Sequence, residues 1–328
     1  MPKVSVIIGI YNPPRKHLHE SLESVFSQTF QDFEVIVVDD GSSIDTQEIL
    51  QPYKNRIRYY YKENGGVNTA RLLGLGKAQG KFIALIDQDD IWPPEKLKKQ
   101  VEFLENYPEL DFIFSDFHNF SEDGFYPKTF LDSNEIFRTI PTEKVSNVSS
   151  KAYIFPNNIL FDYLRGNFLL QGTFMAEKNM CEKYKMFITK INGREFYEFG
   201  LRTFHLFKVG FIDEVLLYRR IHGNNVVLNF ELWQKNTLAI CEEALKYPWM
   251  DAECKKFLND EVIKSHFNLG RYYFHQDDFI EARKHFKTVM ARNPSHPQVI
   301  FRWLLTFIPS KSMVLQGKAL WNRLKTFQ

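Results

Sequence analysis

Acidic residues that follow an apolar run of the sequence have the spacing of a metal or polar-ligand site. The run Phe82–Ile86 ends in three carboxylates, Asp87, Asp89 and Asp90. An unbroken apolar run of this kind predicts a strand buried on both faces, as in a parallel sheet, and open α/β sheets bind ligands at the carboxyl ends of such strands. If the backbone stays extended there, alternation puts Asp87 and Asp89 on one side. Two crowded carboxylates then need a cation such as Mg²⁺ or Mn²⁺.

An ordinary interpretation of the same residues is a solvated acidic turn that caps the next helix. Asp90 lies shortly before Pro93 and Pro94, and a helical pattern follows over Glu95–Asn106. Acidic residues and prolines are common at the start of helices. The segment alone therefore leaves both interpretations open.

A second acidic strand end favours the ligand site. The run Phe33–Val38 ends in Asp39 and Asp40, and the first run, Val4–Ile10, ends at a turn. Strand and helix patterns alternate with short connections over residues 3–118, which predicts right-handed βαβ units whose strand ends share one edge of a largely parallel sheet. No glycine-rich phosphate loop follows the first strand, so metal and side chains would have to hold a diphosphate.

Composition indicates how many domains the chain can hold, which partners are disfavoured and in which compartment the protein is expected. The chain has 328 residues, of which 44% are hydrophobic, so it can hold one large or two smaller domains. A net charge of +2 makes no case for nucleic acid. Three cysteines without metal or disulfide spacing, no signal-peptide pattern and no apolar run of about 20 residues predict a cytoplasmic protein. The 31 Phe predict a bulky core and some aromatic surface.

Four ordered motifs resemble the family 2 inverting glycosyltransferases with the GT-A fold. They are Val4–Ile8 with Tyr11-Asn12, Val37–Ser42, Glu63–Gly66 with Ala70-Arg71 and Gly74, and Ile86–Asp90 with Trp92-Pro93. The resemblance covers about residues 3–227. It implies an α/β catalytic domain over residues 1–230, with a mainly parallel central sheet flanked by helices, a nucleotide-binding half of about 1–118 and an acceptor half of about 119–230.

The resemblance also implies roles for the acidic residues. Asp39 and Asp40 would hold the nucleotide base, expected to be uracil, Asp87 would face the ribose, and Asp89 would bind Mn²⁺ or Mg²⁺. Further members of the expected site are Tyr11, Asn12, Arg71, Gln88 and Arg220 around the nucleotide sugar and its diphosphate, and His222 beside the metal. The alternative is that Arg219 and His222 form only a basic surface turn.

The catalytic base is the main departure from the family pattern. Phe196 stands where the family has the acid that removes the acceptor proton, and Leu72 stands where Asn is common. Gly9 and Ile10 replace a common Pro-Thr pair. Glu195 and Glu198 are the candidate bases, because three residues apart they share one helix face. The alternative is that both are solvated and the base lies elsewhere.

Residues beyond 118 are expected to serve the acceptor and partners. Asn167–Thr173 resembles the family strand that lines the acceptor site, although an ordinary edge strand fits equally. Residues 231–328 predict a helical region with one tetratricopeptide-like unit, about 262–296, which cannot bury its own face and should pack on the catalytic domain or another chain. The tail from Phe301 to Lys325 mixes Trp, Leu and Phe with cations, which predicts peripheral contact with the inner face of the membrane; a core role for its Trp residues is the alternative.

The predicted function is metal-dependent, inverting transfer of a sugar from a UDP-sugar to a glycan or lipid-linked acceptor, in bacterial surface polysaccharide or glycolipid assembly. The alternative is a catalytically impaired partner subunit that binds the sugar nucleotide and acts through its helical C-terminus. A nucleotidyltransferase would need a glycine-rich basic loop after the first strand, and Tyr11–Pro14 lacks one.

Overall fold

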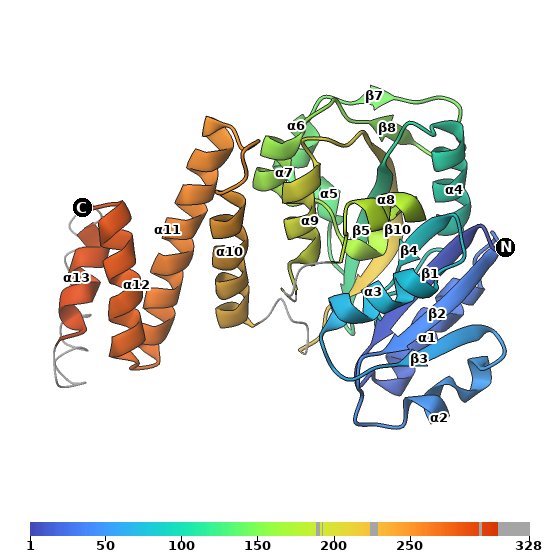
Figure 1. Cartoon of the computed structure of the whole chain (residues 1–328), viewed down its shortest axis with the longest axis horizontal. Coiled ribbons are helices and arrows are strands. Elements are labelled where there is room, and N and C mark those ends of the chain that lie inside the picture. The colour runs from blue at the N-terminus through green and yellow to red at the C-terminus, as the bar shows by residue number, and fades with distance from the viewer. Residues whose placement is uncertain (188–190, 192, 224–228, 295–296, 308–328) are drawn as a thin grey trace. The chain divides into compact units, whose positions relative to one another are not determined.

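The β-branched runs of the N-terminal half form the parallel part of a ten-stranded sheet (Figure 1). The computed structural model describes residues 1–187, 191, 193–223, 229–294 and 297–307. Within them, strands pair in the order β3-β2-β1-β4-β9-β5-β10-β8-β7, and β6 pairs with β5 alone. The strands are β1 (Val4–Ile10), β2 (Phe33–Asp39), β3 (Ile57–Tyr61), β4 (Phe82–Leu85), β5 (Phe112–Ser121), β6 (Gly124–Phe125), β7 (Glu143–Lys144), β8 (Ala152–Ile154), β9 (Met175–Glu177) and β10 (Val209–Arg220).

Strand direction divides the sheet into two regions. The first four strands all run parallel, and β10 runs parallel to β5. Between these regions lies β9, which is antiparallel to both β4 and β5. The carboxyl ends of β1, β2 and β4 therefore share one edge, which is where the sequence has its acidic residues.

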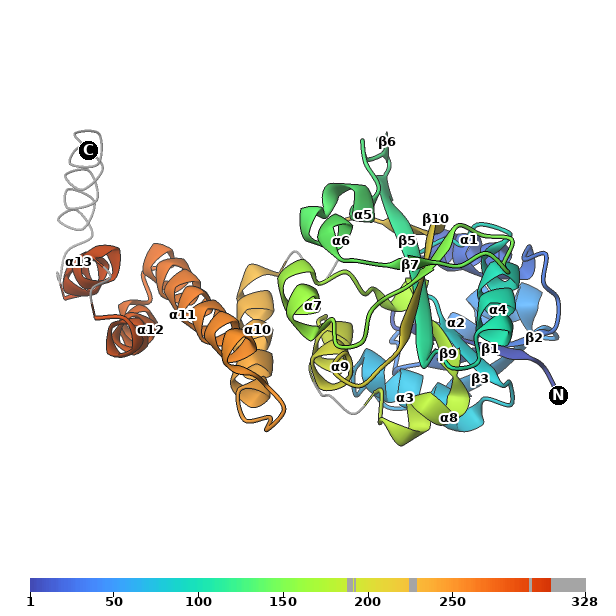
Figure 2. The ribbon, with the colours of Figure 1, turned by 90° about the horizontal axis from the view of Figure 1, so that it is seen from above.

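Helices cover both faces of the sheet (Figure 2). On β1, Val6 belongs to the core that α1 and α4 share, whereas Ile7 points to the other face and closely approaches Gly74 of α3. This is the two-residue alternation expected of a strand that is buried on both sides. The helices of this region are α1 (Arg15–Phe26), α2 (Thr46–Leu50), α3 (Val67–Lys77), α4 (Lys96–Asn106), α5 (Phe130–Ser133), α6 (Glu135–Thr139), α7 (Leu160–Gly166), α8 (Lys178–Lys183) and α9 (Glu195–Thr203).

Phenylalanine rings fill the core beneath α6, α7 and α9. The Phe112 ring lies 5.4 Å from that of Phe174 and 5.5 Å from that of Phe204, between ring centroids. The Phe114 ring likewise contacts Phe168 and Phe211. All six side chains are almost fully buried. The bulky core predicted from the Phe content is thus confirmed.

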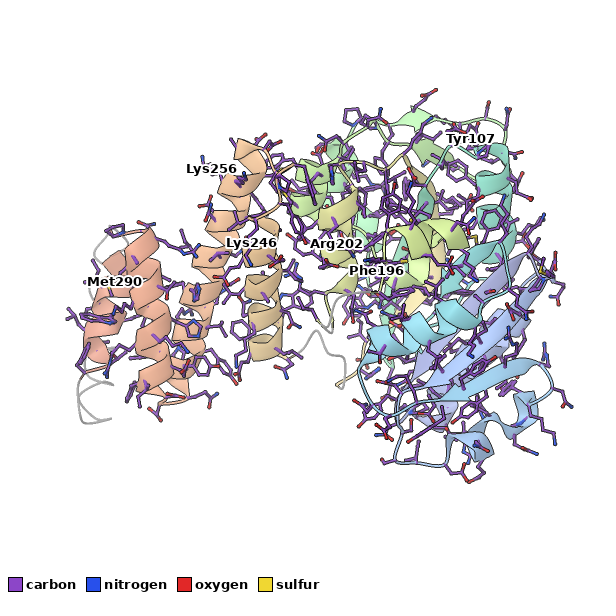
Figure 3. The ribbon with its side chains drawn as sticks, in the orientation of Figure 1. Tyr107, Phe196, Arg202, Lys246, Lys256 and Met290 are labelled. Carbon is purple, nitrogen blue, oxygen red and sulfur yellow. The ribbon has the colours of Figure 1, made fainter. Side chains whose placement is uncertain are left out.

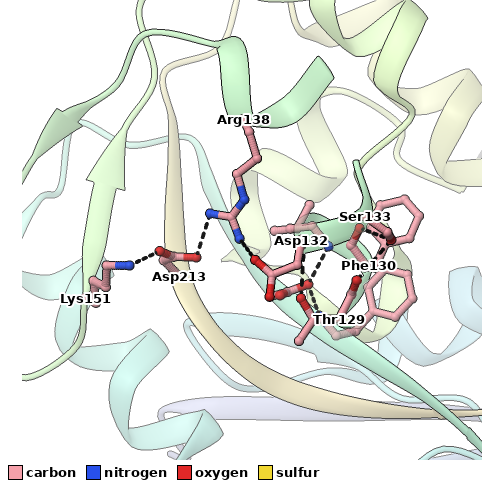
Figure 4. A network of polar contacts seen from close by, with 10 residues as sticks. Thr129, Phe130, Asp132, Ser133, Arg138, Lys151 and Asp213 are labelled. Atoms are coloured by element: carbon pink, nitrogen blue, oxygen red, sulfur yellow. Dashed lines mark hydrogen bonds and ion pairs between the residues drawn. The ribbon is translucent and has the colours of Figure 1, made fainter. Parts of the chain in front are cut away.

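A network of charged side chains joins α5 and α6 to β10 (Figure 4). Asp213 of β10 accepts from Lys151 and, at 3.3 Å, from Arg138 of α6, which also pairs with Asp132 of α5. The Asp213 side chain is mostly buried, but its cationic partners are partly exposed, so each pair stabilises only modestly. The network's main effect is to hold α5, α6 and the segment before β8 on one strand.

The prediction of a strand over Asn167–Thr173 is wrong. Asn167 ends α7 in the left-handed conformation, with φ of 44°, and Gln171–Thr173 form a single 3-10 turn. Left-handed residues suit helix ends rather than strands, and Asn adopts this conformation more readily than most residues. The strand of this region is β9, which begins only at Met175.

The chain divides into two compact units, Met1–Asn225 and Val226–Gln328. The second contains α10 (Phe230–Ala244), α11 (Ala252–His275), α12 (Phe279–Arg292) and α13 (Pro297–Leu305). Phe274, Ala282, Phe286 and Val289 form its buried core. Within the described residues, no helix has the length and apolarity needed to cross a membrane. Of the predicted basic tail, residues 308–328 lie outside the described part of the chain.

A glycine at the contact between α7 and α9 gives a test of this packing. A Cβ at Gly200 would lie 2.1 Å from Cε1 of Tyr163, a fully buried ring. Gly200→Ala should therefore lower the free energy of unfolding by about 1–3 kcal/mol, measured by denaturant titration. Gly76→Ala is the matched control, because a Cβ at this position in the last turn of α3 meets no atom within 4 Å. It should raise stability by about 0.5–1 kcal/mol; equal effects of the two substitutions would contradict the packing described.

Two neighbouring histidines, His285 buried and His266 partly buried, predict how the stability of the helical unit depends on pH. Nδ1 of His266 lies 2.8 Å from Nδ1 of His285. Burial first, then the neighbouring His266, lowers the pKa of His285 to about 4, and burial lowers the pKa of His266. The charged groups around the pair are Glu242, Arg292, Glu281, Lys284 and Lys235.

Because the folded unit favours neutral His285, whereas in the unfolded chain the pKa of His285 is near the ordinary histidine value of 6.5, the contribution of His285 to stability is complete above pH 6.5. The contribution should be lost as pH falls from 6.5 to about 4. Thermal unfolding measured between pH 6.5 and about 4 should show a smaller loss of stability for His285→Gln than for the wild type. His275→Gln, at an exposed position, should lose as much stability as the wild type. The same pH slope in wild type and His285→Gln would refute the assignment.

Candidate active site

Three loops at the carboxyl edge of the sheet are tied together by side-chain amides. Asn12, which follows β1 with φ of 42°, donates its N–H to Ser42 Oγ, and its Oδ1 accepts the N–H of Ser43. The Gln88 amide exchanges two hydrogen bonds with the backbone of Tyr11, at 2.8 and 3.2 Å. The loops after β1, β2 and β4 are therefore fixed to one another, so this edge is a preformed surface.

Asp39 is buried at the end of β2 and is held by donors from its own neighbourhood. Its Oδ1 accepts the N–H of Ser42 at 2.8 Å. Its Oδ2 accepts the hydroxyl of Tyr59 at 3.1 Å and that of Thr46. These contacts fix the orientation of the carboxylate at the position expected beside the nucleotide base.

Asp40 fixes the loop that leads into α3. Its carboxylate pairs with Lys62 at 2.6 Å and accepts the backbone N–H groups of Gly65 and Gly66 at 3.1 and 2.7 Å. A carboxylate with three such donors is well compensated for its burial. By fixing the loop before α3, Asp40 therefore positions the start of the helix that carries Arg71.

Arg71, Asp87 and Gln171 form a polar cluster beside these loops. The Arg71 Nη2 donates to Asp87 Oδ1 at 2.7 Å, and the Gln171 Nε2 donates to Asp87 Oδ2 at 2.6 Å. The Arg71 Nη1 is buried and has no hydrogen-bond partner among the described residues. A buried donor without a partner is costly, and this guanidinium nitrogen could serve a bound anion or ribose oxygen.

Asp87 and Asp89 do not lie on one face of an extended strand. That expectation required an extended backbone, but β4 ends at Leu85 and the Asp90 N–H turns back to the Asp87 carbonyl at 3.3 Å. The prediction of a common strand face is therefore wrong. The two carboxylates instead have different partners, because Asp89 contacts His222.

The Asp89 Oδ2 lies 2.7 Å from the His222 Nε2. Burial first, then the charge of Asp87, raises the pKa of the Asp89 carboxyl, while His222 opposes the rise. Burial followed by Asp89 and Asp87 raises the pKa of Asp90, which accepts the backbone N–H of Arg220 at 3.0 Å. This negative potential favours a bound cation.

The Asp89–His222 pair fits a divalent cation that is bound together with phosphate. One carboxylate oxygen and one imidazole nitrogen converge there, and the described residues contain no cluster of three or more candidate ligands. Mg²⁺ and Mn²⁺ typically take one or two protein ligands and fill the remaining positions with substrate phosphates and water. Two protein ligands therefore suit Mg²⁺ or Mn²⁺ bound together with phosphate and water. They are too few for an ion whose ligands all come from the protein.

Arg220 is held on three sides. Its Nη2 pairs with Glu20 of α1 at 2.5 Å, its Nε donates to the Asp89 carbonyl at 2.9 Å, and its Cζ lies 4.5 Å above the Phe120 ring. The resemblance put Arg220 at the diphosphate end, and the structure locates it beside Asp89. These contacts join α1, the β4 loop and the end of β10.

His17 is a neighbour that the sequence analysis missed. Its ring centroid lies 5.6 Å from that of His222, and its Nδ1 is buried without a partner among the described residues. Burial, then Arg220 and His222, lowers the pKa of His17. The only signal in the sequence is its place in the first turn of α1, the helix that follows the first loop of this edge. Glu20 and Gln171 were also missed, because no sequence pattern relates their positions to the acidic residues.

The two candidate bases on α9 have different surroundings. Both oxygens of Glu198 pair with Arg202, at 2.5 and 3.1 Å, and Arg202 also donates to the Tyr184 carbonyl. Glu195, at the start of α9, accepts the Gly193 N–H on Oε1 at 2.9 Å. Its side chain has no cationic partner among the described residues. Of the two carboxylates, Glu195 therefore has the weaker set of partners among the described residues.

Phe196 is part of the aromatic core. It is 4% exposed, and its ring lies edge-on to that of Phe174 with centroids 5.5 Å apart. Figure 3 labels it on α9 together with Arg202. The side chain at the position of the family's base thus serves packing.

Comparison with known proteins connects this geometry to a group of enzymes. Residues 5–164 match the model of glycosyl transferase family 2. An uncharacterised glycosyltransferase of Methanocaldococcus jannaschii is 31% identical over 234 residues, which cover 70% of this chain and 74% of that protein. The putative teichuronic acid biosynthesis glycosyltransferase TuaG of Bacillus subtilis is 42% identical over 107 residues, 31% of this chain and 42% of that protein.

A similar fold occurs in a solved bacterial structure. Residues 1–349 of S. aureus TarS, solved in complex with UDP-GlcNAc, superpose with a TM-score of 0.61 at 20% identity. The match covers 93% of this chain and 90% of that fragment. Against the longer TarS chain it covers 81% of this chain and 43% of that one.

Proposed function

The chain belongs to glycosyl transferase family 2 and has the GT-A fold, and we propose that it transfers a sugar from a UDP-sugar to an acceptor hydroxyl with inversion at the anomeric carbon. The observation that carries this proposal is the Asp89–His222 pair, which lies at the same sheet edge as the Arg71–Asp87 pair. A sugar nucleotide needs both a polar ribose contact and a cation at its diphosphate.

The proposed donor is a UDP-sugar. TarS, which shares the fold, was solved with UDP-GlcNAc and with UDP. In the proposal, Asp39 and Asp40 shape the base pocket with Tyr11 and Asn12, while Asp87 faces the ribose. The Nη1 of Arg71, which has no hydrogen-bond partner in the part of the chain that the structure describes, supports a contact with the nucleotide. Gln88 fixes the loop that carries these groups.

The proposed cofactor is Mn²⁺ or Mg²⁺, held by Asp89 and His222. A bound divalent cation neutralises diphosphate oxygens and stabilises the charge of the departing nucleoside diphosphate. Arg220 supports this end of the site by orienting the Asp89 loop through its bond to the Asp89 carbonyl. The crowded carboxylates Asp87, Asp89 and Asp90 make a cation favourable here.

The proposed chemical step is a single in-line displacement. The acceptor oxygen forms a bond to the anomeric carbon while the bond from that carbon to the β-phosphate oxygen breaks, and UDP leaves with the electron pair. The transition state has oxocarbenium character. Glu195 accepts the proton of the acceptor hydroxyl, because both oxygens of Glu198 are engaged by Arg202.

The proposed acceptor is a glycan or a lipid-linked glycan of bacterial surface polysaccharide or glycolipid. The name of the Bacillus subtilis relative refers to teichuronic acid biosynthesis, which supports a polysaccharide pathway. A lipid-linked acceptor would agree with peripheral membrane contact through the basic tail.

One observation favours a second candidate function. Phe196 is buried against Phe174 at the position of the family's base. The chain could then bind a sugar nucleotide without transferring it and act as a partner subunit through its helical C-terminal unit. Binding of UDP without UDP release from any UDP-sugar and acceptor would select this candidate.

Loss of the metal carboxylate tests the donor site. Asp89→Asn should reduce UDP release from a panel of UDP-sugars by at least about 10²-fold, because the variant cannot neutralise the leaving group through its cation. EDTA should abolish the wild-type reaction, and Mn²⁺ should restore it. Asp32→Asn, at an exposed position, is the control and should match the wild type. Wild-type turnover in Asp89→Asn would remove the metal role of this residue.

The two glutamates of α9 test the base. Glu195→Gln should lower transfer by about 10²–10⁴-fold while UDP affinity, measured by calorimetry, stays unchanged. Glu198→Gln should cost stability through loss of the Arg202 pair and retain turnover at moderate temperature. Transfer by Glu195→Gln at the wild-type rate would assign the proton to another group.

A further inference from the structure

Beside the candidate site, β5, β6 and β10 present a group of aromatic side chains to solvent. We call His118, Phe120, Phe125 and Tyr218 the aromatic face. The Phe125 ring lies 5.0 Å from those of His118 and Tyr218 and 5.7 Å from that of Phe120, between centroids. Phe125 nevertheless remains 56% exposed, and the next residue, Tyr126, is 45% exposed. Three rings thus support Phe125 from behind while its outer surface stays in water.

The hairpin that carries Phe125 is held in a defined position. Phe120 pairs with Phe125 and Ser121 with Gly124, where a φ of 109° suits the absence of a side chain. The Tyr126 N–H donates to the Asn119 carbonyl at 3.0 Å, and the His118 ring contacts the Tyr126 carbonyl at 2.7 Å. Figure 2 shows the hairpin of β5 and β6 projecting from the sheet. An exposed apolar ring held this firmly is typical of a binding surface.

The aromatic face is continuous with the donor site. On β10, Tyr218 stands in register with His118 and Arg220 with Phe120. The Arg220 guanidinium covers the Phe120 ring and also donates to the Asp89 carbonyl. The backbone of Tyr218 exchanges two hydrogen bonds with Ile91, the residue after Asp90. A molecule stacked on Phe125 would therefore lie next to the edge at which the sugar is transferred.

We propose that the aromatic face binds a pyranose ring of the acceptor, with Phe125 as the stacking platform. This inference rests on the proposed function, because an acceptor must approach the donor from outside the nucleotide loops. A pyranose ring has a face of C–H groups that packs on an aromatic ring, and hydroxyls around its rim that stay hydrated. Phe125 supplies the apolar surface, and the hydroxyl of the exposed Tyr126 supplies a polar group beside it.

Charge at the hairpin favours a glycan over a membrane surface. Glu122 and Asp123 are exposed at the tip next to Phe125. Two carboxylates there would be repelled by an anionic bilayer. They do not oppose binding of an uncharged sugar ring. The proposed ligand class is therefore a glycan with at least one pyranose ring.

The test compares Phe125→Ala with Phe125→Trp in the full chain. The probes are cellotriose, chitotriose and maltotriose, and binding is measured by saturation-transfer NMR in the presence of UDP and Mg²⁺. At least one trisaccharide should bind the wild type, Phe125→Ala should weaken it by about tenfold, and Phe125→Trp should bind as well as or better than the wild type. Trp249→Ala removes another exposed aromatic residue, from the helical unit, and should leave affinity unchanged.

Two results would overturn the proposal: no trisaccharide binds the wild type, or Phe125→Ala binds as well as the wild type. A parallel sedimentation assay uses phosphatidylglycerol vesicles. Loss of vesicle binding in Phe125→Ala with unchanged saccharide binding would assign the face to a membrane and also overturn the proposal.

Failure of the proposed function would look different. UDP release from UDP-sugars without added acceptor is measured in the same variants and should not depend on Phe125. Wild-type protein that releases no UDP from any UDP-sugar, with or without the trisaccharides, but binds a trisaccharide through Phe125 would refute transfer to these sugars and leave the aromatic face supported. Wild-type UDP release together with saccharide binding that is independent of Phe125 would refute the aromatic face alone.

Discussion

Crowding of negative charge at the end of an apolar strand is the constraint on which the Met1–Asn225 unit depends. Asp87, Asp89 and Asp90 lie within four consecutive positions just after β4; Asp90 is buried and Asp89 is partly buried. Like charges so close destabilise one another unless each has its own partner. Arg71 compensates the first and His222 the second, while the third accepts a backbone N–H of β10. The partners come from α3, from β10 and from the segment just after β10, so the site and the fold constrain each other.

Much of this arrangement could be predicted from the sequence, because it follows from local patterns. Apolar runs that end in acid are visible in the chain, and parallel pairing brings their ends to one edge. The rule of alternation failed only where the strand itself stops, at Leu85. The partners Glu20, Gln171 and His17 could not be predicted, since no periodicity relates their positions to the acidic residues. Tertiary structure alone brings them together.

The abundance of phenylalanine illustrates the same limit. Along β5, Phe112 and Phe114 alternate in the same way as His118 and Phe120, yet the first pair is buried and the second only partly so. Alternation tells which residues share a face but not where the covering layer of helices ends. The first part of β5 lies under the aromatic core, and the second part extends into the hairpin with β6. Identical residue types therefore form core in one place and surface in the other.

The contacts around Phe196 differ from those that orient the acidic residues of the sheet edge, so Phe196 can coexist with the proposed sugar-nucleotide site. The contacts that orient Asp39, Asp87 and Asp89 come from loops, α3, the 3-10 turn and β10. At position 196, a carboxylate would have to lose its water among rings such as Phe174, at a cost of several kcal/mol. Glu195 is one residue nearer the start of α9, where the positive end of the helix dipole favours an ionised carboxylate. An ionised carboxylate is the form that accepts a proton, so the helix that lacks the family's acid still favours a base in its first turn.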